Sequence, residues 1–200
     1  MKYLKTTGLT ALLLAGVLLA PAGASATTAA LCKVNSTPCG AGNYYEAGQA
    51  IKSVLESGSK VVFDAGFYKV ECTASSISGK VLKKGVTEVA VVTLETVSFE
   101  GCGCGVKTLK PGTMSVTWVN GTMNGKLTTA GIEVSIPCMS PNCVYGEGPF
   151  GTLTGGAMAT IHASGFMNRV KGEPIPCPAT ITWEAGYTVT TPEPLWVSES

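Results

Sequence analysis

The sequence of 200 residues contains little of what catalysis and nucleic-acid binding usually require. It has one histidine, His162, and one aspartate, Asp64, so side chains for acid–base chemistry or metal binding are scarce. Charged residues make up 14% of the chain, well below the ~25% of ordinary soluble domains. The formal net charge of +1 excludes a nucleic-acid binder that works by neutralising phosphates. The hydrophobic content of 45% excludes a disordered tail.

The N-terminal segment, residues 1–26, has the features of a secretory signal peptide in the expected order. Two lysines precede an apolar run over residues 9–20, which is shorter than the ~18–20 residues that span a bilayer. Residues 24–26, Ala-Ser-Ala, then supply the small-residue pattern that signal peptidase cleaves. We therefore predict a secreted, extracellular product of residues 27–200, with no transmembrane segment after cleavage.

All eight cysteines lie in the predicted secreted product, where an even number indicates structural disulfides. Spacing and elimination favour the bridges Cys32–Cys39, Cys72–Cys102, Cys104–Cys138 and Cys143–Cys177. The alternatives are redox chemistry at Cys102-Gly-Cys104 and a zinc site that adds Cys138 and Cys143 to this pair. The single residue between Cys102 and Cys104 is tighter than either kind of site usually has. We predict no bound metal and no cofactor.

Apolar and polar residues alternate with a period of two through most of the predicted product, which indicates β-strands. The strand-like runs are residues 61–72, 77–82, 89–99, 106–109, 115–119, 125–129, 132–136, 153–155, 158–170, 180–189 and 195–197. Residues 47–55 fit either a short helix or an edge strand. Short strands separated by Gly and Pro turns are typical of sandwiches and barrels. We predict one all-β domain over residues 27–200, a mostly antiparallel β-sandwich or, alternatively, a partly closed barrel, braced by disulfides.

The last third of the chain carries motifs in a fixed order. They are Cys143-Val-Tyr-Gly146, Gly151-x-Leu153-x-Gly155-Gly156, Ala159-Thr-Ile161, Cys177-Pro178 and Trp183-x-Ala185-x-Tyr187-x-Val189-Thr190-x-Pro192-x-Pro194-Leu195-Trp196-Val197. This series resembles a group of small secreted proteins from high-GC Gram-positive bacteria. The resemblance implies secretion and a disulfide-tied β architecture, and it supplies no catalytic residue. Cys104 and Cys138 are additions to the pattern.

The aromatic residues provide the candidate ligand contacts. Alternation predicts that Trp118 and Trp183 belong to the core, whereas Tyr44, Tyr45, Phe150 and Trp196 are expected to be more exposed. Exposed rings can stack on sugars or anchor a protein partner. We therefore predict a non-catalytic extracellular or wall-associated binding or structural protein, with an envelope glycan or a surface protein as its partner.

Two other functions are compatible with the residues present. A secreted glycosidase-like hydrolase would need two glutamates to meet, and Glu133 and Glu184 are the pair on separate strands that could do so. A Ser–His–Asp site built from His162 and Asp64 lacks the G-x-S-x-G motif. A small protein inhibitor would present a cysteine-braced loop, for which residues 137–143 are the candidate.

Overall fold

The computed structural model describes residues 28–83, 89–138, 140 and 143–199, so the predicted signal peptide lies outside the described residues. The regular elements are all strands: β1 (Ala29–Cys32), β2 (Ala50–Leu55), β3 (Val61–Asp64), β4 (Lys69–Cys72), β5 (Ala74–Lys83), β6 (Val89–Glu100), β7 (Lys107–Lys110), β8 (Thr113–Trp118), β9 (Gly125–Ala130), β10 (Glu133–Ser135), β11 (Val144–Gly146), β12 (Gly148–Thr154), β13 (Thr160–Lys171), β14 (Thr180–Thr191) and β15 (Trp196–Glu199). The all-β prediction is confirmed.

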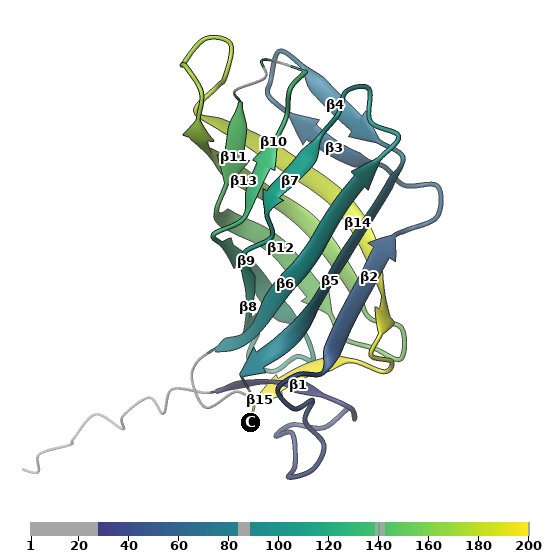
Figure 1. The fold of residues 1–200 in the computed structure, drawn as a ribbon. Coiled ribbons are helices and arrows are strands. Elements are labelled where there is room, and N and C mark those ends of the chain that lie inside the picture. Colours follow the sequence, from purple (N-terminus) through teal and green to yellow (C-terminus); the bar gives the residue numbers. More distant parts are fainter. Residues whose placement is uncertain (1–27, 84–88, 139, 141–142, 200) are drawn as a thin grey trace, which may run out of the picture.

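Eight of these strands close into an antiparallel barrel in the order β14, β2, β5, β6, β8, β9, β12 and β13 (Figure 1). The closing pair, β13 with β14, runs from Thr160 opposite Thr188 to Asn168 opposite Thr180. Period-two alternation is common to sandwiches and barrels, so closure depends on this long-range pairing. Of the two predicted architectures, the chain adopts the barrel, and the barrel is fully closed.

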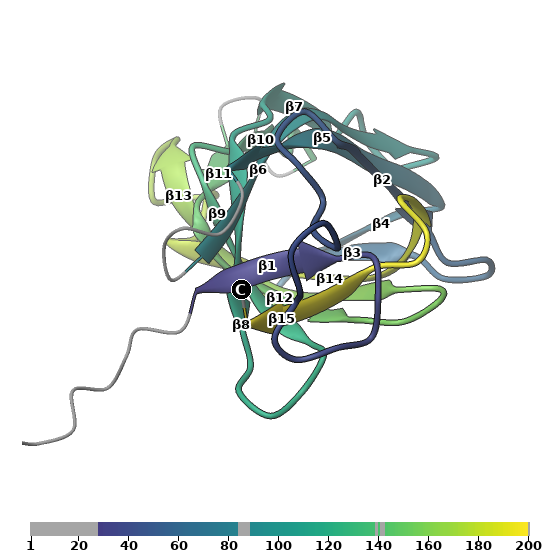
Figure 2. The same cartoon turned by 90° about the horizontal axis from the view of Figure 1, so that it is seen from below.

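Two groups of short strands lengthen the wall at what we term the upper end. β3 and β4 continue the sheet beyond β14, and β11, β10 and β7 continue it beyond β13 (Figure 1). At the opposite, lower end, β1 and β15 form a separate two-stranded ribbon that lies across the barrel (Figure 2). We term this ribbon the cap.

Alternation along the strands decides which side chains fill the barrel. On β14, Trp183, Tyr187 and Val189 point inward and are buried, while the residues that alternate with them are more exposed. The upper interior is aromatic, because the Trp183 ring packs against Phe63, Phe99 and Phe150 at centroid distances of 5.4, 5.4 and 4.8 Å. Trp183 is therefore in the core, as predicted.

All eight cysteines form disulfides, in the four pairs that spacing favoured: Cys32–Cys39, Cys72–Cys102, Cys104–Cys138 and Cys143–Cys177. The first joins the end of β1 to the loop after it. The other three join segments that enter or leave strands at the upper end. The loops of the upper end are thus fastened covalently to one another.

Two local predictions need correction. Residues 47–55 contain a strand, β2, and it lies between β14 and β5 rather than at an edge. The run 61–72 is a hairpin, because Gly66 adopts a φ of 84° and the chain reverses between Asp64 and Lys69. Asp64 Oδ1 accepts a hydrogen bond of 2.7 Å from the Gly66 N–H, which holds this turn.

Candidate functional site

The four aromatic residues predicted to contact a ligand do not form a common exposed surface. Tyr45 is buried and its hydroxyl donates a hydrogen bond of 2.5 Å to the Pro194 carbonyl, so it fastens the cap region. Phe150 is buried against Trp183, because it points inward from β12. Tyr44 and Trp196 are half-buried against the small apolar cluster of the cap. The expected exposure of Tyr45 and Phe150 is therefore wrong.

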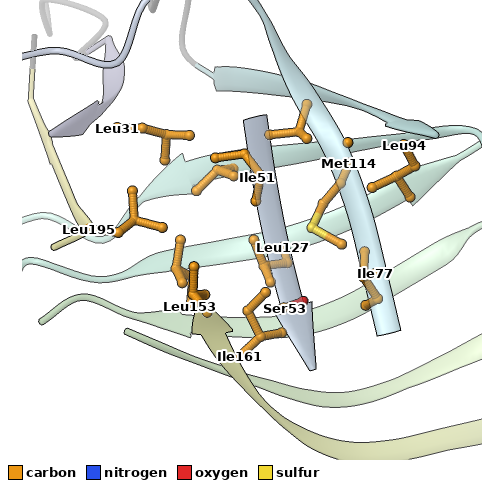
Figure 3. Close-up of a pocket in the computed structure, with 14 residues that line it drawn as sticks. Leu31, Ile51, Ser53, Ile77, Leu94, Met114, Leu127, Leu153, Ile161 and Leu195 are labelled. Atoms are coloured by element: carbon orange, nitrogen blue, oxygen red, sulfur yellow. The ribbon is translucent and has the colours of Figure 1, made fainter. Parts of the chain in front are cut away.

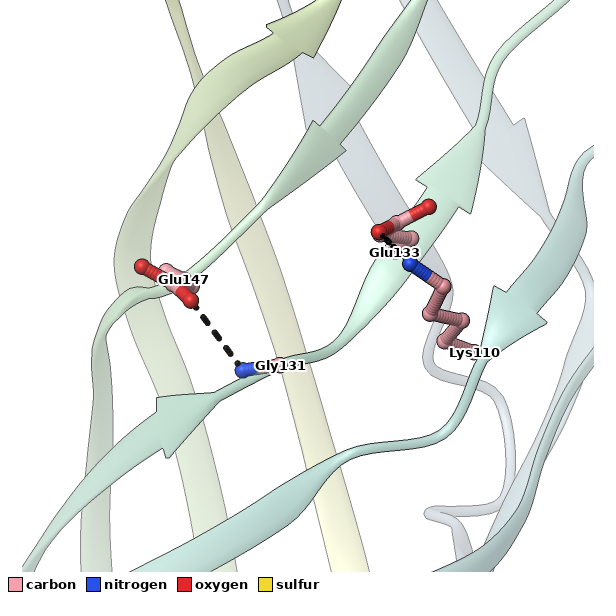
Figure 4. Close-up of polar contacts among 4 residues, drawn as sticks. All are labelled: Lys110, Gly131, Glu133 and Glu147. Carbon is pink, nitrogen blue, oxygen red and sulfur yellow. Dashed lines mark hydrogen bonds and ion pairs between the residues drawn. The ribbon is translucent and has the colours of Figure 1, made fainter.

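The glutamates considered for hydrolysis lie apart. Glu133 on β10 forms an ion pair with Lys110 (Figure 4), whereas Glu184 on β14 lies opposite Ser164 and Val62. Strands β11 and β13 separate β10 from β14 in the sheet. The geometry therefore does not bring these two carboxylates into one site.

Glu147 is a third carboxylate in this region and has an unusual backbone. It adopts a φ of 51° at the junction between β11 and β12. Its Oε1 accepts a hydrogen bond of 3.3 Å from the Gly131 N–H (Figure 4), and its carbonyl accepts one of 3.4 Å from the Asn168 N–H. These contacts hold the left-handed conformation at the point where the chain passes from β11 to β12, both of which pair with β13.

His162 and Asp64 are also separated. Asp64 lies opposite Thr182, which in turn lies opposite Phe166, whereas His162 is four residues away on β13. Four residues of strand span about 13 Å. The Gly66 N–H and the Lys69 ammonium lower the pKa of the Asp64 carboxyl. Asp64 thus has a structural role in its turn.

Two of the three most exposed apolar side chains lie at the upper end, on turns that flank β14. Ile175 is 88% exposed in the loop of residues 172–179, and Phe67 is 68% exposed in the turn of residues 65–68. The paired residue of β14 nearest to the Ile175 loop is Thr180, which lies opposite β13. The paired residue of β14 nearest to the Phe67 turn is Thr182, which lies opposite β3. The two turns therefore project from neighbouring hairpins at the same end. We term Ile175, Phe67 and the exposed Tyr68 the rim patch.

The loop that carries Ile175 is held in place from several sides. Cys177 is bridged to Cys143, and its N–H donates a hydrogen bond of 3.3 Å to the Glu173 carbonyl. Arg169 Nη1 donates one of 2.5 Å to the Cys177 carbonyl. Pro174, Pro176 and Pro178 restrict the backbone on both sides of Ile175. The side chain is thus presented to solvent on a rigid support.

The candidate inhibitor loop, residues 137–143, falls partly outside the described residues, at positions 139, 141 and 142. Glu88, another acidic residue of the sequence, also lies outside them. Among the residues that the structure describes, no group of three or more His, Cys, Asp or Glu side chains is arranged to hold a metal ion.

A second hollow is a small apolar pocket of about 30 Å³ in the lower half of the barrel (Figure 3). Leu31 and Leu195 line it on the cap side, and Met114, Leu127 and Ile161 come from the barrel wall. Ser53 on β2 is the one polar side chain among the described residues that line it.

Ser53 differs from the neighbouring buried serine, Ser75. Ser75 Oγ donates a hydrogen bond of 2.7 Å to the Ser98 carbonyl and lies 3.0 Å from the Tyr187 hydroxyl. Burial raises the pKa of Tyr187 to about 12, so its phenol stays protonated and can donate to Ser75. Ser53 is 1% exposed, and within the described part of the chain its Oγ has no hydrogen-bond partner.

This contrast predicts opposite effects for two similar substitutions. Ser53→Ala removes a buried hydroxyl that makes no hydrogen bond, so the free energy of unfolding is expected to rise by about 1 kcal/mol. Ser75→Ala leaves the Ser98 carbonyl and the Tyr187 hydroxyl without their partner. The free energy of unfolding of this variant is therefore expected to fall by about 1–2 kcal/mol. Denaturant unfolding of both variants measures the difference. A loss of stability in Ser53→Ala would contradict the unpartnered state of Ser53.

Comparison with known proteins gives no relative from which a function could be transferred: the chain matches no family model, no curated protein and no solved structure. Within residues 28–83, 89–138, 140 and 143–199 there is no helix with the length and apolarity needed to cross a membrane.

Proposed function

We propose that the protein is exported and acts outside the cytoplasm as a non-catalytic binding protein, with a surface protein as its partner. Export is supported by the signal-peptide features of residues 1–26 and by four disulfides, which persist in oxidising environments. The rim patch supplies the binding surface.

The observation that carries this proposal is the exposure of Ile175 on a braced loop. A large apolar side chain left in water gains no stabilisation from burial, and exposed apolar patches, unlike single exposed residues, mark interaction sites. Because the disulfide, the prolines and Arg169 already fix the loop, binding would require little further ordering of the backbone. Phe67 and Tyr68 on the neighbouring turn add aromatic area of the kind that dominates protein interfaces.

A protein partner fits this surface better than a glycan. Tyr44, Tyr45, Phe150 and Trp196 were expected to stack on a glycan or anchor a protein partner, but two of these rings are buried and two are half-buried. The rim patch instead offers a branched aliphatic side chain at its most exposed point. Such a side chain fills an apolar pocket and cannot stack on a sugar ring.

Binding of the labelled exported protein to intact cells of the producing organism tests the proposal. Ile175→Asp is expected to weaken this binding about tenfold or more, because it places a charge where an apolar anchor is needed. Met158, 74% exposed in the turn between β12 and β13, provides the matched control, since Met158→Asp adds the same charge outside the rim patch. Both variants are expected to unfold at the temperature of the unmodified protein.

Protease treatment of the cells and a test with isolated wall polysaccharide distinguish a protein partner from a glycan. Protease treatment is expected to abolish binding, and isolated wall polysaccharide is expected to retain none of the labelled protein. The proposal is wrong if Ile175→Asp binds as tightly as Met158→Asp, or if binding survives protease and transfers to the polysaccharide.

A further inference from the structure

The hairpin of β8 and β9 contains two Asn-Gly pairs, and the structure gives them opposite surroundings. Asn120-Gly121 lies in the turn between the two strands, whereas Asn124-Gly125 lies where β9 begins. The turn is at the lower end of the barrel, because the Val197 N–H of the cap donates a hydrogen bond of 3.0 Å to the Met123 carbonyl. It is at the end opposite the rim patch, so the chemistry of this turn does not depend on the proposed function.

The first pair is free to change its backbone conformation. Asn120 and Gly121 are both exposed, and a side chain added at Gly121 would meet no atom of the described residues within 4 Å beyond its chain neighbours. The bond that closes the turn is made by the flanking residues, since the Thr122 N–H donates a hydrogen bond of 3.1 Å to the Val119 carbonyl. Gly121 adopts a φ of 75°, and glycine occupies positive and negative φ about equally readily. The peptide unit between Asn120 and Gly121 can therefore rotate without breaking the bond that closes the turn.

The second pair is fixed by its hydrogen bonds. Asn124 Oδ1 accepts a hydrogen bond of 3.1 Å from the Gly155 N–H, and the Asn124 carbonyl accepts one of 3.0 Å from the Val119 N–H. The Asn124 N–H donates one of 3.1 Å to Thr122 Oγ1. Gly125 is buried and pairs with both neighbouring strands, β8 and β12. The Asn124 side chain and the nitrogen that follows it are therefore both held in place.

We propose that Asn120 is a site of spontaneous deamidation. The Gly121 nitrogen, which no neighbouring side chain hinders, forms a bond with Asn120 Cγ. The Cγ–Nδ2 bond breaks, and the Gly121 proton leaves with ammonia by way of solvent. Water then opens the cyclic succinimide at either carbonyl group, which gives aspartate or isoaspartate at this position. Water is the co-reactant, and the step converts a neutral side chain into an anion.

Incubation of the intact protein at mildly alkaline pH, followed by tryptic mapping with mass spectrometry, tests this site. The tryptic peptide of residues 108–126 contains both asparagines, so fragmentation between them locates the modified one. In the folded protein Asn120 is expected to react about tenfold faster than Asn124 or more, because the hydrogen bonds of Asn124 must open before it can react. In the chain that has been reduced and unfolded in denaturant, the two rates are expected to be similar, since glycine follows both asparagines.

Asn120→Gln provides the matched variant, because it keeps the amide but would have to close a larger ring. Ion-exchange chromatography of the intact protein is expected to show a more acidic species that grows during the incubation of the original chain and not of this variant. The proposal is overturned if Asn120 and Asn124 react at equal rates in the folded protein, if Asn120 does not react there, or if Asn120→Gln acidifies as fast as the original chain. Because Ile175 and the other rim residues are unchanged, binding to cells reports separately on the proposed function.

Discussion

Trp183→Ala is expected to lower the free energy of unfolding by about 3–5 kcal/mol, which is the range for truncating a large buried aromatic side chain. Trp183 is 2% exposed and packs against Phe63, Phe99 and Phe150, which come from three other strands. The substitution would therefore leave a cavity that three separate elements border. Because these elements are joined by hydrogen-bonded sheet and by disulfides, they can close only a part of it.

Denaturant unfolding followed by circular dichroism measures this loss, and Phe67→Ala provides the control. Phe67 is a large aromatic residue at the same end of the barrel, but its ring lies mostly in solvent. Its truncation is expected to change the stability by less than about 0.5 kcal/mol. Similar losses for the two variants would show that the aromatic cluster does not stabilise the upper barrel.

Removal of the Cys143–Cys177 bridge is expected to have the second largest effect. The chain-entropy model gives a loss of about 4 kcal/mol for the double variant Cys143→Ala/Cys177→Ala, because the bridge closes a loop with a sequence separation of 34. The variant also frees the loop that presents Ile175. Binding to cells is therefore expected to weaken together with stability, because the loop must then be ordered on binding.

The Cys32–Cys39 bridge provides the matched comparison, since its sequence separation is only 7. The same model gives about 2.5 kcal/mol for Cys32→Ala/Cys39→Ala. This variant changes the cap and leaves the rim loop braced, so cell binding is expected to be retained. An equal or larger stability loss for the short bridge, or unchanged cell binding after loss of the long one, would contradict these expectations.

The alternating strands were the most predictable part of the fold. In β14 the pattern of Ile181, Trp183, Tyr187 and Val189 follows directly from the period of two, and the structure buries all four. β1 was not predicted, because its four residues are all buried and its sequence shows no alternation. The sequence did not distinguish the barrel from the sandwich. Strands alternate with the same period of two in both architectures, and the pairing of β13 with β14, which closes the barrel, does not alter that period.

The candidate sites were less predictable than the strands. Ser53 shares an alternating face with Ile51 and Leu55, so sequence reasoning could place it inside the sheet but not beside a cavity. Ile175 lies outside every strand-like run, and its exposure follows from the three-dimensional path of its loop. The signal that could have marked it is the spacing of Pro174, Pro176 and Pro178 around Cys177, which is typical of a rigid loop.

The closure of the barrel has a consequence for self-association. In the large sheet, the two outermost strands are β4 and β7, and each is only four residues long. β4 begins with Lys69, and β7 has lysines at both ends, Lys107 and Lys110. Short, lysine-bearing strands at such positions oppose edge-to-edge addition of another chain. The protein can therefore present an apolar rim while its sheet resists growth into aggregates.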